Sequence, residues 1–247
     1  MKRWQLLAIG LALYALALVV TAPATLTDTM LRNVSDGRLR LADAQGSVWS
    51  GSGQLLIRDA AGRVGVARSL SWQLQPAALW RARLVYRIDF GADSRPFPVT
   101  LAWSHVTLTN ANIDLPAATL GYVVPKLAAL ALGGEVHLQI ANLVIGQRTL
   151  QGETTLQWHN AGSALSPVSP LGDYQLHLTG AGNELRVVLT TLQGPLQLYG
   201  EGAWADGSRP NFAISATVPP DLRQRLEPFL RLIAVKQVDG SFAMQLQ

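Results

Sequence analysis

The side chains best suited to acid–base and metal chemistry are the four histidines, and their spacing does not predict a reactive site. They are His105, His137, His159 and His177. No two lie four residues apart, as on one face of a metal-binding helix, and none is near a carboxylate pair with ligand spacing. His137 and His177 occupy the polar positions of alternating segments, which predicts solvent-facing strand residues.

Other patterns that carry chemistry are also missing from the sequence. The chain has no cysteine, which excludes disulfides, thiolate metal sites and cysteine nucleophiles. There is no Gly-x-Ser-x-Gly turn, and Gly51-Ser-Gly53 lacks the lysine and the helix of a phosphate loop. Gly180-Ala-Gly182 leads into a predicted strand, which argues against a dinucleotide site. We therefore expect no catalytic residue, no metal site, no cofactor and no enzymatic activity.

Strands are the predicted elements that position these residues. Apolar and polar residues alternate with period two in several segments, among them Val136–Ile140, Tyr174–Leu178, Phe212–Val218 and Phe242–Leu246. Turn sequences such as Asp36-Gly37, Gly133-Gly134 and Ala181-Gly-Asn183 separate the runs. Alternating segments separated by turn sequences predict a mainly β fold, with an antiparallel, curved sheet and a few short helices.

Few segments have helical character. Pro23–Asn33 predicts a short amphipathic helix, and Leu115–Leu132 predicts a helix that Pro125 splits or kinks. Pro219–Val235 predicts a helix with proline at its entrance. Pro76–Trp80 predicts a single turn between strands Ser69–Gln75 and Ala82–Phe90. The run 163–172 is expected to be a loop within one continuous sheet.

The longest apolar run lies at the N-terminus. Residues 6–20 contain no charge and follow Lys2 and Arg3, the pattern of a signal peptide or signal anchor. With its flanks the run approaches the ~20 residues that span a bilayer. Ala22-Pro-Ala24 offers a cleavage site, but no polar break precedes it, and we favour a retained anchor. We expect residues 1–24 to be a cytoplasmic tail and single transmembrane helix, and residues 25–247 to be one exported β-rich domain.

Charge is unevenly distributed along the chain. Residues 1–100 contain twelve basic and six acidic side chains, whereas the chain as a whole has a net charge of +4. A basic membrane-proximal half favours contact with anionic lipid headgroups. The acidic residues that interrupt it, and the lack of any binding motif, argue against nucleic acid as a partner.

Short motifs along most of the chain resemble the protein N family of the type II secretion system. Gly46-Ser-Val-Trp49-Ser-Gly51 is similar to the family's strand and turn just after the membrane, and Trp72 with Pro76 to its next element. Trp158 belongs to a set of later glycine-marked segments that also resemble the family: Leu132-Gly-Gly-Glu-Val136, Gln151-Gly152, Leu171-Gly172 and Gln193-Gly-Pro-Leu196. On the residues alone, Gly46 and Gly51 are expected to bracket a strand in which Trp49 is buried.

The resemblance implies a function without catalysis. It implies a bitopic inner-membrane subunit, with its bulk in the periplasm, that takes part in the export of folded proteins across the outer membrane. The implied partners are the other bitopic inner-membrane subunits, with the outer-membrane secretin as a further candidate; the oligomeric state is left open.

Two questions stay open at the level of sequence. Arg81, Arg83 and Arg87 lie at i, i+2 and i+6 of a predicted strand, so one face of it is either a partner-facing surface or a solvated one. The strand cadence around Pro76 is also similar to AsmA-like periplasmic proteins, which makes a lipid-binding or lipid-transfer module the alternative function.

Overall fold

A computed structural model describes most of the chain. It covers residues 3–58, 64–91, 94–123, 125–146, 149–205, 211–233, 235–236 and 242–246. The α-helices in this part are α1 (Arg3–Val20), α2 (Thr25–Val34), α3 (Leu120–Val123), α4 (Pro125–Ala128) and α5 (Pro220–Ile233). Two 3₁₀ turns accompany them, η1 (Pro76–Arg81) and η2 (Ala117–Thr119).

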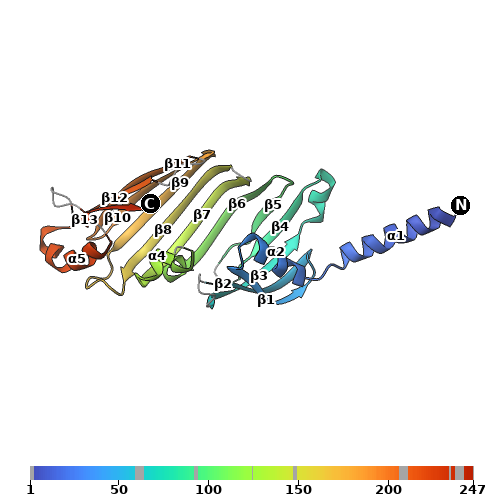
Figure 1. Ribbon diagram of the computed structural model, residues 1–247, viewed down its shortest axis with the longest axis horizontal. Helices are drawn as coiled ribbons and strands as arrows, with labels where there is room; N and C mark the ends of the chain where they lie inside the picture. The colour runs from blue at the N-terminus through green and yellow to red at the C-terminus, as the bar shows by residue number, and fades with distance from the viewer. Residues whose placement is uncertain are drawn as a thin grey trace.

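The strands of the described residues form one 14-stranded antiparallel sheet (Figure 1). In chain order they are β1 (Leu39–Gly46), β2 (Ser50–Arg58), β3 (Val64–Leu74), β4 (Leu84–Asp89), β5 (Phe97–Leu101), β6 (His105–Pro116), β7 (Leu132–Gly146), β8 (Leu150–Ser163), β9 (Gly172–Gly182), β10 (Glu184–Gln193), β11 (Gln197–Ala205), β12 (Asn211–Thr217), β13 (Val235–Lys236) and β14 (Phe242–Leu246). Each strand from β1 to β11 pairs with the next along the chain, and β14 lies between β12 and β13. The prediction of a mainly β, antiparallel fold is confirmed.

Most of the predicted segments match the observed elements. α2 at Thr25–Val34 matches the amphipathic helix predicted at Pro23–Asn33, and α5 at Pro220–Ile233 lies within the helix predicted at Pro219–Val235. The helix predicted at Leu115–Leu132 is shorter in the structure, because β6 extends to Pro116 and the helical residues that follow, in η2, α3 and α4, end at Ala128. The predicted break before Pro125 falls at position 124, which lies outside the described residues. Residues 164–171 form the loop between β8 and β9 of one sheet, as expected.

The Gly133-Gly134 turn was a wrong prediction. Both glycines lie inside β7, and the pairing of β7 with β8 shifts between Gly133 and Glu135. Gly134 has a φ of +99°, the conformation in which glycine allows an extra residue to bulge out of a strand. A glycine pair therefore marks a bulge here and not a strand end.

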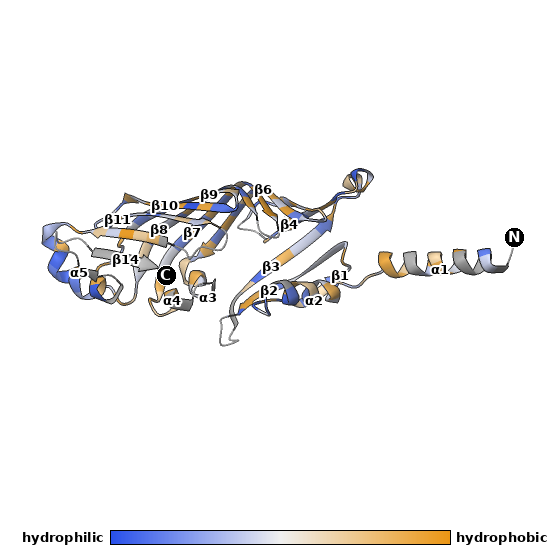
Figure 2. Cartoon of the chain, turned by 45° about the horizontal axis from the view of Figure 1, so that its top comes forward, coloured by the Kyte–Doolittle hydropathy of each residue, from blue (hydrophilic) through white to orange (hydrophobic). Residues whose placement is uncertain are grey.

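The buried side chains form three separate clusters along the sheet. The first joins α2 to β1 and β3 through Ala24, Leu41 and Trp72. The second lies between β5, β6 and β7, and the third packs α5 against the C-terminal strands through Leu226, Phe229 and Leu230. In Figure 2 the helices α2, α3, α4 and α5 lie below the arch of the central strands. Within the described residues, the long sheet is thus stabilised in local units along its length.

Asp28 fixes α2 to the first strand. Its carboxylate accepts the Leu41 backbone N–H at 2.8 Å and contacts the guanidinium groups of Arg40 and Arg32 at 3.1 Å. Burial alone would raise the pKa of this carboxyl, but the Leu41 amide and the two arginines outweigh it and the pKa is lowered. The ionised form is therefore the one that stabilises the fold.

Asp28→Asn is expected to lower the free energy of unfolding by about 1–2 kcal/mol at neutral pH. Because the folded-state pKa is lowered, the wild-type advantage is present above the pKa of the unfolded carboxyl and disappears as the pH falls through the folded value. Urea unfolding of the full chain in detergent at several pH values measures this. The exposed Asp36→Asn change is the control, and an equal loss in both variants would contradict the assignment.

α1 projects away from the sheet at one end of the molecule (Figure 1). Its apolar side chains are largely uncovered: Leu11 is 70% exposed and Leu18 is 54% exposed. Figure 2 shows apolar colouring along much of the described helix. Among the described residues, none of the helices combines the length and the apolar character that a membrane crossing requires.

Candidate functional site

The residues just after α1 are bonded to the turn between β1 and β2. Pro23 forms an isolated antiparallel bridge with Ser47. The Val48 N–H donates to the Ala22 carbonyl at 2.9 Å, and the Ala24 N–H donates to the Gly46 carbonyl at 3.1 Å. We call Ala22–Ala24, Gly46–Gly51 and Trp72 the hairpin joint. These backbone bonds fix the direction in which the chain passes from α1 to the sheet.

Trp49 connects the hairpin joint to α1. Its indole N–H donates to the Val19 carbonyl at 2.8 Å, in the last turn of the helix, where the same carbonyl also accepts the Ala22 N–H at 3.3 Å. The expectation that Trp49 lies buried in a strand was wrong. It is half-buried in the bend between β1 and β2, because Gly46 and Gly51 bracket a turn and not a strand.

Trp72 holds the same turn from the side of β3. It is 5% exposed, and its indole N–H lies 3.1 Å from each of the carbonyl oxygens of Ser47 and Val48. A Cβ at Gly51 would lie 2.5 Å from the Trp72 ring and 2.4 Å from the Gln45 carbonyl oxygen. The glycine therefore permits the close approach of the tryptophan, and this part of the motif works as a packing unit.

Pro76 and Trp158, the remaining motif residues, lie outside the hairpin joint. Pro76 is exposed and begins η1, where its fixed φ suits the first position of a helical turn. Trp158 lies in β8, donates to the Gly133 carbonyl at 2.9 Å and contacts the Tyr174 ring at a centroid distance of 5.9 Å. Both have structural contacts in separate parts of the sheet.

The three candidate arginines do not share a strand face. Arg81 is the last residue of η1, Arg83 follows the turn, and only Arg87 lies in a strand, β4. The predicted strand Ala82–Phe90 begins two residues late because Ala82 adopts a left-handed conformation with a φ of 52°. All three arginines are exposed. The prediction that these three arginines lie on one face of a strand was therefore wrong.

A cluster of histidines and aspartates crosses four strands, which the sequence pattern did not indicate. His137 on β7 contacts Asp114, its partner on β6. The rings of His137 and His159 lie edge to face at a centroid distance of 5.1 Å, and His159 Nδ1 is 3.6 Å from an Asp173 oxygen. The Asn160 N–H, with further help from Gln193 and His159, lowers the pKa of Asp173. Only knowledge of the strand register could have found this cluster.

The histidines and aspartates of this cluster are arranged in pairs and not as a metal-binding set. In the part of the chain that the structure describes, no three histidine, aspartate or glutamate side chains are placed to hold a metal ion. His105 and His177 lie apart from the cluster, beside Ser104 and Thr155 respectively. The polar contacts of the four histidines are to a residue next in the chain or to a side chain on a neighbouring strand.

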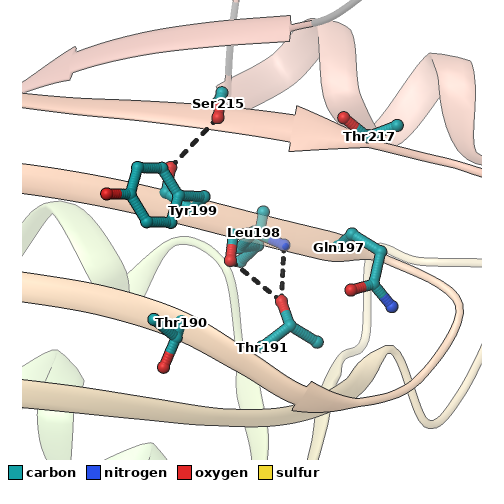
Figure 3. A pocket seen from close by; sticks show the side chains of 7 residues that line it. All are labelled: Thr190, Thr191, Gln197, Leu198, Tyr199, Ser215 and Thr217. Atoms are coloured by element: carbon teal, nitrogen blue, oxygen red, sulfur yellow. Dashed lines mark hydrogen bonds between the residues drawn. The ribbon is translucent and has the colours of Figure 1, made fainter.

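Two cavities on the described sheet surface mix polar and apolar side chains. One of about 310 Å³ is lined by Leu198, Tyr199 and the hydroxyl and amide side chains around them on β10 to β12 (Figure 3). There Thr191 Oγ1 donates to the Leu198 carbonyl at 2.9 Å and accepts the Leu198 N–H at 2.6 Å. Another of about 330 Å³, near the first hairpin, is lined mainly by serine, glutamine and aspartate. Each of the two also has a leucine in its lining, Leu198 in the first and Leu70 in the second.

The fold and the joint define a class of protein: a long open meander sheet whose first hairpin is built onto the end of an apolar helix. Comparison by sequence identifies the family. The family described as "Type II secretion system (T2SS), protein N" matches residues 37–245, so the chain belongs to this family. No curated protein and no solved structure matches the chain.

Proposed function

We propose that this protein is a non-catalytic, bitopic inner-membrane subunit of the type II secretion system. Membership of the protein N family is the observation that carries the proposal. It implies interaction with other components of the system. The proposed partners are the other bitopic inner-membrane subunits and, as a further candidate, the outer-membrane secretin.

Residues 1–24 are proposed as the cytoplasmic tail and anchor, and residues 25–247 as the periplasmic domain. The uncovered apolar side chains of α1 support the anchor, because a helix with Leu11 and Leu13 more than 60% exposed gains free energy from a lipid environment. The hairpin joint supports the division, because backbone bonds begin to attach the chain to the sheet at Ala22.

The absence of turnover chemistry is tested with the histidines. Single alanine changes at His105, His137, His159 and His177 are expected to leave secretion by a complemented deletion strain unchanged, because their contacts are structural. Extracellular substrate is measured against the amount of the variant protein in membranes. Complete deletion of the chain is the positive control. A histidine variant that abolished secretion at a normal protein level would contradict the proposal.

Arg87 is the residue that we propose for contact with a partner subunit. It is exposed on β4, between Gln73 of β3 and Pro98 of β5, so the strands hold its position in the sheet. Exposed arginine in a rigid element is a typical contact residue of protein interfaces.

Arg87→Ala is therefore expected to reduce co-purification of the other secretion subunits without lowering the amount of folded protein. Pull-down from detergent-solubilised membranes measures the loss. Arg186→Ala is the matched control, since Arg186 is also an exposed arginine within a strand, β10. Equal capture with both variants would refute the role of Arg87.

A lipid-transfer module is not favoured. Such a module needs a continuous apolar groove, whereas the cavities near β10 to β12 and near the first hairpin are separate hollows that mix polar and apolar side chains, and family membership points to the secretion system.

A further inference from the structure

The tryptophans outside strands gather at one end of the sheet. Successive connections of a meander alternate between its two ends, so the β1–β2, β3–β4 and β5–β6 connections share an end. Each contains one tryptophan: Trp49, Trp80 and Trp103. The other tryptophans of the chain lie in α1 or in strands. Because Trp49 bonds to Val19, this is also the end that holds α1.

Two of these tryptophans are exposed to an unusual extent. Trp80 is 94% exposed and Trp103 is fully exposed, while the neighbouring Leu79 and Leu101 are 47% and 36% exposed. An indole ring leaves a large apolar area in water when it is uncovered. Several such side chains at adjacent loop tips indicate a surface that contacts something else.

The charge at these tips has one sign. The residues of the three connections, 46–50, 75–83 and 102–104, include Arg81 and Arg83 and no acidic residue. Arg83 and Ala102 line a common cavity of about 230 Å³ with Thr100, His105 and Thr107, so the second and third connections are neighbours. We call Leu79–Arg83 and Leu101–Trp103 the tryptophan rim.

We propose that the tryptophan rim rests in the headgroup region of the anionic bilayer that holds α1. Indole rings favour the membrane–water interface, and arginine favours anionic headgroups. The hairpin joint brings the first connection of this end to the end of α1, and Figures 1 and 2 both place η1 at the α1 end of the molecule. The sheet would then stand on the membrane surface at several points. This inference rests on the proposed anchor.

The lack of cysteine allows a direct test on the full chain. A single cysteine at Leu79 carries a fluorescent label on the tryptophan rim, a single cysteine at Ser104 carries one directly beside it, and both leave Trp80 and Trp103 in place. Arg95→Cys labels an exposed residue of the β4–β5 connection, at the opposite end of the same strands. Leu13→Cys labels α1. The protein is reconstituted in vesicles of phosphatidylethanolamine and phosphatidylglycerol that contain lipids with a nitroxide either at the headgroup or deep in the acyl chain.

Labels at Leu79 and Ser104 are expected to be quenched by the headgroup nitroxide and to lose most of their quenching by aqueous iodide. The label at Arg95 is expected to remain open to iodide. Equal behaviour at positions 79, 104 and 95 would overturn the proposal. The label at Leu13 separates the two hypotheses: deep quenching there with no rim contact refutes the rim alone, whereas iodide access at Leu13 refutes the anchor.

The charge is tested in the same vesicles. Arg81→Gln with Arg83→Gln, or a change to neutral phosphatidylcholine, is expected to remove most of the headgroup quenching at Leu79. Quenching that is unchanged by both treatments would overturn recognition of anionic lipid. A label that is protected from iodide only after other secretion subunits are added would show a protein contact and would also overturn the proposal.

Discussion

Replacing Trp72 with alanine is expected to lower the free energy of unfolding by about 3–5 kcal/mol. The ring is 5% exposed and fills the space beside Gly51. Its removal also leaves the Ser47 and Val48 carbonyls without the indole donor. Denaturant unfolding of the full chain in detergent measures the loss, and membranes should contain less of the variant than of the wild type.

Trp80→Ala is the matched control for that experiment. It removes the same side chain from a position that is 94% exposed, so its effect on unfolding is expected to stay within about 0.5 kcal/mol. Similar losses in the two variants would show that the hairpin joint does not depend on burial of Trp72.

Gly46→Ala is the second large effect, with an expected loss of about 2–4 kcal/mol. Two costs combine at this position. Gly46 has a φ of +91°, and a Cβ there would lie 2.5 Å from the Ser50 carbonyl oxygen and 2.9 Å from the Gly51 Cα. The backbone of the turn must therefore move, and it bears the bonds to Ala22 and Ala24. Unfolding in denaturant again gives the magnitude.

Gly37→Ala separates the two costs. Gly37 has a φ of +78° but nothing within 4 Å of its Cβ position, so it carries the conformational cost alone, about 1 kcal/mol. Gly133→Ala, with open space and no left-handed φ, is expected to have the smallest effect. If Gly46→Ala cost no more than Gly37→Ala, the close contact with Ser50 would have no energetic consequence.

The strands could be predicted from the sequence because alternation reports which side chains share a face. The segments 136–140, 174–178 and 212–217 follow that rule and are strands. Glycine was harder to interpret, because the same residue permits a turn or a bulge. Gly133-Gly134 was placed in a turn but lies in a bulge within β7.

The candidate site could be predicted less well than the fold. The sequence motifs pointed to Gly46, Trp49, Gly51 and Trp72. The prediction that Trp49 lies buried in a strand was wrong, because it lies in the bend between β1 and β2. Contacts across strands depend on register, which alternation leaves undetermined. The cluster of His137, His159, Asp114 and Asp173 was missed for that reason. The prediction that Arg81, Arg83 and Arg87 share one strand face was wrong because Ala82 adopts a left-handed conformation, and the strand begins only at Leu84.

The meander order of the sheet has a consequence for how the domain forms. From β1 to β12 every strand bonds to the strand that precedes it in the chain, so each new hairpin needs only the one already made. Contacts between neighbouring segments close short loops and favour rapid folding. With the proposed periplasmic placement of residues 25–247, strands nearest the anchor would emerge first, and later strands could add to the growing edge before the C-terminal residues have been delivered.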